Sequence, residues 1–175
     1  MKHQDHVQLI KNGLQRKKEV WADLGSGDGA FTLAVAELLD PLSEIYSIEK
    51  DQSRLNNQKM AFKQMFRDAH IHFLNSDFTK KMEIPPLDGI IMANSLHYIK
   101  EKEPFLRLLR GYLKNPGKLI IVEYNAREGN MWVPYPLPFS SFETLALNTG
   151  FSKPQLIGRV PSEFLQEIYA GVTTI

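Results

Sequence analysis

A glycine-rich stretch, VWADLGSGDGAFT at residues 20–32, constrains the fold of this chain more than any other segment. Its first three residues are apolar and typical of a short buried strand, whereas the residues after Gly29 repeat apolar side chains at three- and four-residue steps, the pattern of a helix face. Gly25, Gly27 and Gly29 separate the two elements. A strand, a glycine turn and a helix form the first unit of a nucleotide-binding βαβ fold, in which the bare backbone of the turn approaches a ligand.

An acidic residue at the expected distance from the glycines supports a nucleotide site. Residues 44–48 predict a second strand, and Glu49 ends it about 20 residues after the glycine turn. A carboxylate at this strand end can accept hydrogen bonds from both hydroxyls of a ribose. An exposed acid in the charged run 49–51 is the alternative. Because the side chain would face a cleft, we expect it to contribute little to the stability of the protein without ligand.

The segment DLGSGDGAF, which begins at Asp23, closely resembles the first motif of class I S-adenosylmethionine-dependent methyltransferases. The glycines alone also satisfy the dinucleotide pattern G-x-G-x-x-G/A, so a nicotinamide-binding protein is an alternative. A second alternative is a module that binds S-adenosylmethionine but has no methyl acceptor. The acid before the first glycine and the third glycine make the methyltransferase motif the more specific match. The resemblance spans residues 20–175 and implies S-adenosyl-L-methionine as the cofactor.

The resemblance also implies which other residues hold the cofactor. After a strand predicted at 70–74, Asp77 and Phe78 match the family's positions for recognition of the adenine, although an aspartate that caps a turn is the alternative. The apolar strand predicted at 87–93 leads to Asn94 at the edge that borders the methyl group. The implied cofactor-binding residues are Asp23, Gly25, Ser26, Gly27, Gly29, Glu49, Lys50, Asp77, Phe78 and Asn94.

The acceptor is expected on the other side of that edge. Residues 125–139 contain three prolines together with Trp132 and Tyr135, and a long apolar loop in a small domain is usually functional. We therefore predict that this loop borders the acceptor, with Trp132 and Tyr135 as its walls. His97 is expected on the same side, where it could contact the acceptor; the alternative is that it only packs against its neighbours. No catalytic residue is predicted, because a base is needed only if the acceptor begins protonated.

The remaining segments predict one α/β domain over residues 1–175. Its expected form is a doubly wound Rossmann-like sheet of five parallel strands followed by a C-terminal antiparallel pair, with helices on both faces. Segment 1–19 contains a predicted helix from about residue 5 to 14. A turn at 115–117 should end the helix before the fifth strand at 118–124, and Ser140 with Glu143 should form a capping box. The closing strands are predicted at 153–159 and 164–174.

Composition excludes several functions. The chain contains no cysteine, which rules out disulfides, thiolate–metal sites and a protein thiol nucleophile. His70 and His72 lack a third ligand in the sequence, so we predict no metal site. With 21 Lys and Arg against 20 Asp and Glu, the net charge of +1 argues against nucleic acid as a partner and favours a small-molecule acceptor. Neither a secretory signal nor a membrane span is evident, so we expect a cytoplasmic protein; the oligomeric state is open.

Overall fold

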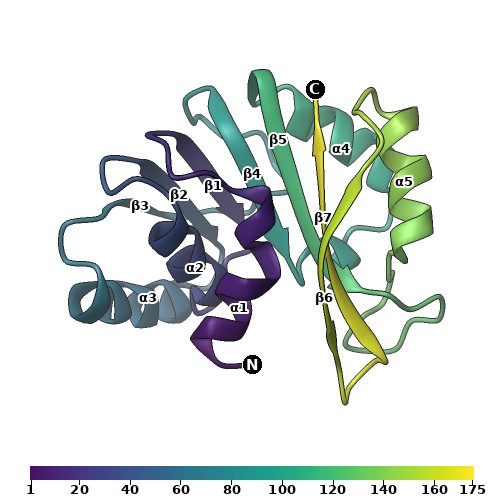
Figure 1. Cartoon of the computed structure of the whole chain (residues 1–175), viewed down its shortest axis with the longest axis horizontal. Coiled ribbons are helices and arrows are strands. Elements are labelled where there is room, and N and C mark those ends of the chain that lie inside the picture. Colours follow the sequence, from purple (N-terminus) through teal and green to yellow (C-terminus); the bar gives the residue numbers. More distant parts are fainter.

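A seven-stranded sheet forms the centre of the protein, which is described over residues 1–175 by a computed structural model (Figure 1). The strand order is β3-β2-β1-β4-β5-β7-β6. Neighbouring strands among the first five run parallel, and β7 runs antiparallel to both β5 and β6. This arrangement confirms the predicted fold class. The strands are β1 (Val20–Leu24), β2 (Glu44–Glu49), β3 (His70–Asn75), β4 (Leu87–Ala93), β5 (Leu113–Tyr124), β6 (Gln155–Pro161) and β7 (Glu167–Thr174).

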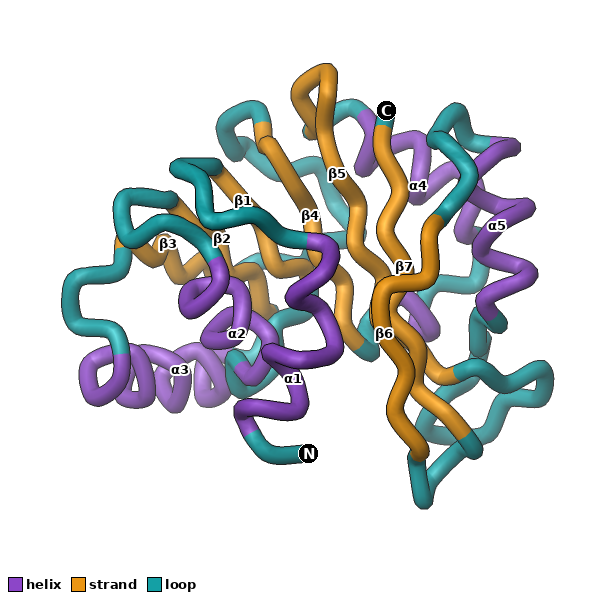
Figure 2. Tube along the Cα trace, viewed as in Figure 1, coloured by secondary structure: helices purple, strands orange, loops and turns teal.

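Helices lie on both faces of the sheet, as predicted (Figure 2). None of them has the length and apolar character that crossing a membrane requires. The α-helices are α1 (His3–Ile10), α2 (Ala30–Leu38), α3 (Gln52–Met65), α4 (Lys102–Arg110) and α5 (Phe139–Asn148), and the two 3₁₀ helices are η1 (Lys11–Gly13) and η2 (Leu96–Tyr98).

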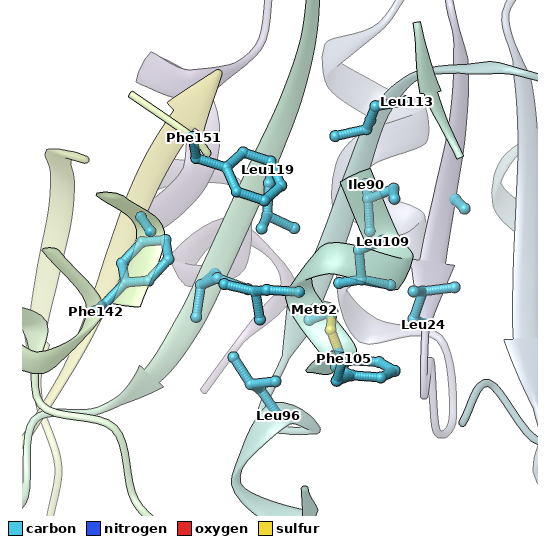
Figure 3. Close-up of a cluster of buried hydrophobic side chains, with 14 of the residues drawn as sticks. Leu24, Ile90, Met92, Leu96, Phe105, Leu109, Leu113, Leu119, Phe142 and Phe151 are labelled. Carbon is cyan, nitrogen blue, oxygen red and sulfur yellow. The ribbon is translucent and has the colours of Figure 1, made fainter. Parts of the chain in front are cut away.

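The central strands β1 and β4 are mostly apolar because both of their faces are covered. Side chains alternate along a strand, so Trp21 of β1 packs with residues of α1 and α2, whereas its neighbour Ala22 joins the core beneath α4 and α5. Figure 3 shows part of this second core, in which Met92 of β4 and Phe105 of α4 lie among the labelled side chains. The two cores fix the strands, and thereby fix the loops at their carboxyl ends.

Two local predictions were wrong. The turn at 115–117 lies inside β5 rather than at the end of a helix, because β5 begins at Leu113 and its pairing with β4 shifts between Leu87 and Gly89. Residues 114–117 therefore form an irregularity within the strand, and α4 has already ended at Arg110.

The capping box at Ser140 and Glu143 is also not formed. The N-cap of α5 is Pro138, which makes no side-chain capping bond, and the amide of Phe139 donates to Oδ1 of Asn125 at 3.1 Å. A hydrogen bond to Asn125, distant in the sequence, thus caps the first turn of α5 in place of the predicted capping box. Glu143 pairs with Lys153 instead, at 3.4 Å.

Candidate functional site

A cavity of about 560 Å³ opens beside the carboxyl ends of β1, β2 and β4, and its volume suits a small ligand. A larger hollow of about 780 Å³, between the start of α4 and the length of α5, contains none of the predicted site residues. The 560 Å³ cavity is lined by the predicted residues Gly25, Glu49, Lys50, Asp77, Phe78 and Asn94, and by Asp51, Arg54, Thr79, Ser95, Tyr98 and Ile99, which the sequence did not indicate.

The glycine loop has the backbone that its sequence predicts. Gly25, Gly27 and Gly29 have φ angles of 76°, 56° and 86°, which L-residues with side chains rarely adopt. At Gly25 there is also no room, since an added Cβ would lie 2.7 Å from Cβ of Ser95 and 2.9 Å from Cε1 of Phe78. Gly25 therefore packs directly against two residues that line the cavity.

Gln58 of α3 holds this loop from behind and was not predicted. It is fully buried, and its Nε2 donates to Oγ of Ser26 at 2.8 Å and to the carbonyl of Gly27 at 2.6 Å. Its Oε1 accepts from Oγ of Ser47 at 2.7 Å. The one signal in the sequence was a polar residue on the apolar face of the helix, between Leu55 and Phe62.

Glu49 lies at the end of β2, as predicted, but its surroundings differ from the expectation. It is only 8% exposed, and its carboxylate accepts two backbone hydrogen bonds, from Gly27 to Oε2 and from Asp51 to Oε1, both at 2.9 Å. These bonds join the strand end to the glycine loop. These bonds argue against the expectation that Glu49 contributes little to stability, because removing the carboxylate would leave both amides without this partner.

Two polar atoms at the ends of neighbouring strands are buried without a partner. Asp23, at the end of β1, accepts from Oγ1 of Thr32 at 2.6 Å through Oδ2, but its Oδ1 has no partner. Burial raises the pKa of the Asp23 carboxyl to about 7. The hydrogen bond from Thr32 opposes this shift, and the charge of Glu49 adds a smaller increase. Asn94, which follows β4, has φ 52° and a buried Oδ1 that also lacks a partner. Such atoms are rare in folded proteins and call for a polar ligand or water.

Asp77 and Phe78 both line the cavity. Asp77 caps its own turn, since Oδ1 accepts from the amide of Thr79 at 3.0 Å and from its hydroxyl at 2.7 Å, and these bonds lower the pKa of Asp77. Oδ2 makes no hydrogen bond within the chain, so capping leaves one oxygen for a ligand. Lys50 is exposed, and its backbone carbonyl accepts from Nδ2 of Asn75 at 2.8 Å.

His97 forms a buried pair with Glu123, for which the sequence predicted no role. His97 is 2% exposed, its Nδ1 lies 2.8 Å from Oε2 of Glu123, and its amide donates to Oε1 at 3.0 Å. A carboxylate only accepts, so we assign the hydrogen to Nδ1. Nε2 makes no hydrogen bond within the chain, and the His97 side chain as a whole is 3% exposed. The sequence feature that could have indicated Glu123 is an acidic residue near the end of the otherwise apolar segment KLIIVEY.

The two residues of the 125–139 loop that were predicted to border the acceptor, Trp132 and Tyr135, lie in different surroundings. The amide of Tyr135 donates to the carbonyl of His97 at 3.0 Å, and Lys102 Nζ donates to the carbonyl of Tyr135 at 2.8 Å, so Tyr135 lies beside His97. Trp132 is 65% exposed and does not line the cavity. The side chain of Asn130 accepts from the amides of Trp132 and Val133, and Val133 is the residue that this turn buries.

Comparison with known proteins places the chain among methyltransferases. A family model described as a methyltransferase domain matches residues 15–149. A search of curated proteins found no match to the sequence.

Solved structures share the fold at low sequence identity. One is a protein of Nostoc punctiforme PCC 73102 with a provisional assignment as an O-methyltransferase, with 21% identity and a TM-score of 0.75 over 99% of this chain. This chain spans 55% of that protein. A SAM-dependent methyltransferase from Aquifex aeolicus has 16% identity and a TM-score of 0.75, with 98% of this chain and 89% of the other covered. The YcgJ protein from Bacillus subtilis has 11% identity and a TM-score of 0.77, with 98% of each chain covered.

The family model covers most of the chain, including the glycine loop, the cavity and His97. The strand order and the closing antiparallel pair agree with what the glycine motif implied. The chain therefore belongs to the methyltransferase-domain family, as the resemblance of its first motif to class I S-adenosylmethionine-dependent methyltransferases predicted.

Proposed function

We propose that the protein transfers the methyl group of S-adenosyl-L-methionine to a small-molecule acceptor. One observation carries this proposal: Gly25 of the glycine loop, Glu49, and Asp77 with Phe78, which come from three separate segments, line a single cavity of ligand size. The acceptor would enter from the side of η2, where His97 and Tyr135 lie together.

The residues of the cavity suit each part of this cofactor. Glu49 is placed to accept from ribose hydroxyls, and Asp77 with Phe78 to border the adenine. The partnerless oxygens of Asp23 and Asn94 suit the ammonium group at the methionine end, because an ammonium group offers three donors. When bound, the cofactor supplies a methyl group on a sulfonium, and its departure leaves a neutral thioether. The protein therefore needs chiefly to align the acceptor and exclude water.

Calorimetric titration tests this proposal directly. S-adenosylhomocysteine, which has the same adenosine and methionine ends, should bind to the purified protein, and NADH should not. If NADH bound and S-adenosylhomocysteine did not, the nicotinamide alternative would replace the proposal. A module without an acceptor would bind S-adenosylhomocysteine as well, so only an acceptor titration separates it from an enzyme.

Glu49→Ala should weaken the binding of S-adenosylhomocysteine by at least about 10-fold, because a hydrogen bond to a charged group contributes about 1.5–3 kcal/mol. It should also lower the free energy of unfolding by about 1–3 kcal/mol, since the amides of Gly27 and Asp51 lose their acceptor. Calorimetry and urea denaturation measure the two effects separately.

The matched control is Glu44→Ala, which removes a carboxylate from the opposite end of the same strand. This variant should keep its affinity for S-adenosylhomocysteine. Asp51 is unsuitable as a control, because it lines the cavity and its side chain accepts from the amides of Ser53 and Arg54 at the start of α3. An affinity of Glu49→Ala within threefold of wild type would remove the ribose role from Glu49.

A further inference from the structure

We infer that the acceptor is a planar aromatic molecule with an ionisable hydroxyl group, held against Tyr98, Tyr124 and Phe164 with its hydroxyl at Nε2 of His97. This inference rests on the proposed function and names the class of acceptor for the same site.

Aromatic rings from three separate elements form a row of contacts that includes His97. The ring centroid of His97 lies 4.3 Å from that of Tyr98 in η2 and 6.2 Å from that of Tyr124 at the end of β5. Phe164, in the turn between β6 and β7, lies 5.7 Å from Tyr124. In Figure 1 the β6–β7 hairpin extends beyond the carboxyl ends of β4 and β5.

The outer rings of this cluster are open to a ligand. Tyr98 is 58% exposed and Phe164 is 48% exposed, although both belong to a cluster whose centre is buried. Tyr98 also lines the cofactor cavity, so the cluster adjoins the place where the methyl group would be presented. A flat aromatic ring matches these walls, because aromatic pairs prefer offset or edge-to-face contacts with centroids about 4.5–7 Å apart.

His97 is the group in this cluster that can take a proton. Glu123 holds the ring through Nδ1 and the amide, which leaves the lone pair of Nε2 free. Lys102 is occupied by the carbonyls of Ile99 and Tyr135. Burial raises the pKa of Tyr124, so this phenol stays neutral and can only donate or accept a hydrogen bond. A free imidazole nitrogen among aromatic walls suits an acceptor whose hydroxyl must lose its proton, as a phenol must.

The reaction needs only these groups and S-adenosyl-L-methionine as the methyl donor. The hydroxyl proton of the acceptor moves to Nε2 of His97 while the bond between the acceptor oxygen and the methyl carbon forms. The electron pair of the breaking carbon–sulfur bond returns to sulfur. The products are an aryl methyl ether, a thioether and an imidazolium, whose charge lies next to the carboxylate of Glu123 and whose proton then leaves to solvent.

The test uses the protein saturated with S-adenosylhomocysteine and three probes: 4-nitrophenol, nitrobenzene and cyclohexanol. We expect 4-nitrophenol to bind with a gain of its phenolate absorption band, nitrobenzene to bind at least about fivefold more weakly, and cyclohexanol not to bind. His97→Gln should keep its affinity for S-adenosylhomocysteine but bind 4-nitrophenol without the phenolate band.

Phe164→Ala should weaken 4-nitrophenol binding by about fivefold and leave S-adenosylhomocysteine binding unchanged, because Phe164 does not line the cofactor cavity. Trp132→Ala is the matched control, since it removes another exposed aromatic side chain and should change neither affinity. Binding of S-adenosylhomocysteine without binding of 4-nitrophenol would overturn this inference alone. So would a loss of 4-nitrophenol binding in Trp132→Ala but not in Phe164→Ala. A protein that bound no S-adenosylhomocysteine would overturn the proposed function first.

Discussion

Replacing Gly25 by alanine is expected to lower the free energy of unfolding by about 2–5 kcal/mol. The backbone at this position is left-handed, with φ 76°, and a side chain there costs free energy in any surroundings. The new methyl group would also press on Ser95 and Phe78, which lie 2.7 and 2.9 Å from its position. Because Gly25 lines the cavity, binding of S-adenosylhomocysteine should fall as well. Urea denaturation followed by circular dichroism measures the stability change.

Gly27→Ala is the matched control for this substitution. Its φ of 56° carries the same kind of backbone strain, but the nearest atom to an added Cβ is Nη1 of Arg54 at 3.4 Å, the end of a flexible side chain. The variant should therefore lose only about 1–2 kcal/mol. Equal losses in the two variants would show that the crowding by Ser95 and Phe78 is relieved by small shifts.

Asp23→Asn should remove a dependence of stability on pH. Burial raises the pKa of the Asp23 carboxyl from 3.8 to about 7, so the folded protein keeps a proton that the unfolded chain has already lost. The stabilisation is complete at low pH and is lost as the pH rises towards 7. Relative to wild type, the variant should therefore gain about 2–3 kcal/mol of stability between about pH 5 and about pH 8.

The difference between wild type and variant is the quantity to measure, by denaturation at several pH values. His6, whose pKa is lowered by burial, changes stability in the opposite direction but is present in both proteins and cancels. Asp77→Asn is the control from the same cavity, because hydrogen bonds lower the pKa of Asp77 and its difference should stay flat over this range. A flat difference for Asp23→Asn would mean that the buried carboxyl is already ionised at pH 5.

The parts of the fold that the sequence predicted are those set by local patterns. The alternation of apolar strands with helix faces placed β1, β2 and β4 nearly to the residue, and the spacing of Glu49 from the glycines placed it at the cavity. Side-chain partners could not be predicted in the same way. The two amides bound by Glu49 depend on where the glycine loop turns, and the bond from Gln58 to Ser26 depends on how α3 packs.

The acceptor side shows the same limit. Trp132 and Tyr135 lie in one proline-rich segment and look equivalent in sequence, yet a turn around Asn130 leaves Trp132 in solvent while Tyr135 bonds to His97. Phe164 was assigned only to a closing strand, and its approach to Tyr124 follows from the length of the hairpin. Contacts between segments distant in the chain decided these positions.

The place of β7 in the sheet bears on how this protein folds. β7 follows β6 in the chain but lies between β5 and β6, so β6 joins the sheet only through β7. Pairs within the hairpin, such as Pro161 with Glu167, close a short loop, whereas Tyr124 must find Ile168 across a long one. Short loops close at a smaller entropic cost. We therefore expect the hairpin to form early and dock as one unit, an order that pulsed hydrogen exchange during refolding can follow. The contact between Tyr124 and Phe164 would then form only when the hairpin docks on β5, so the aromatic residues around His97 would come together in that single step.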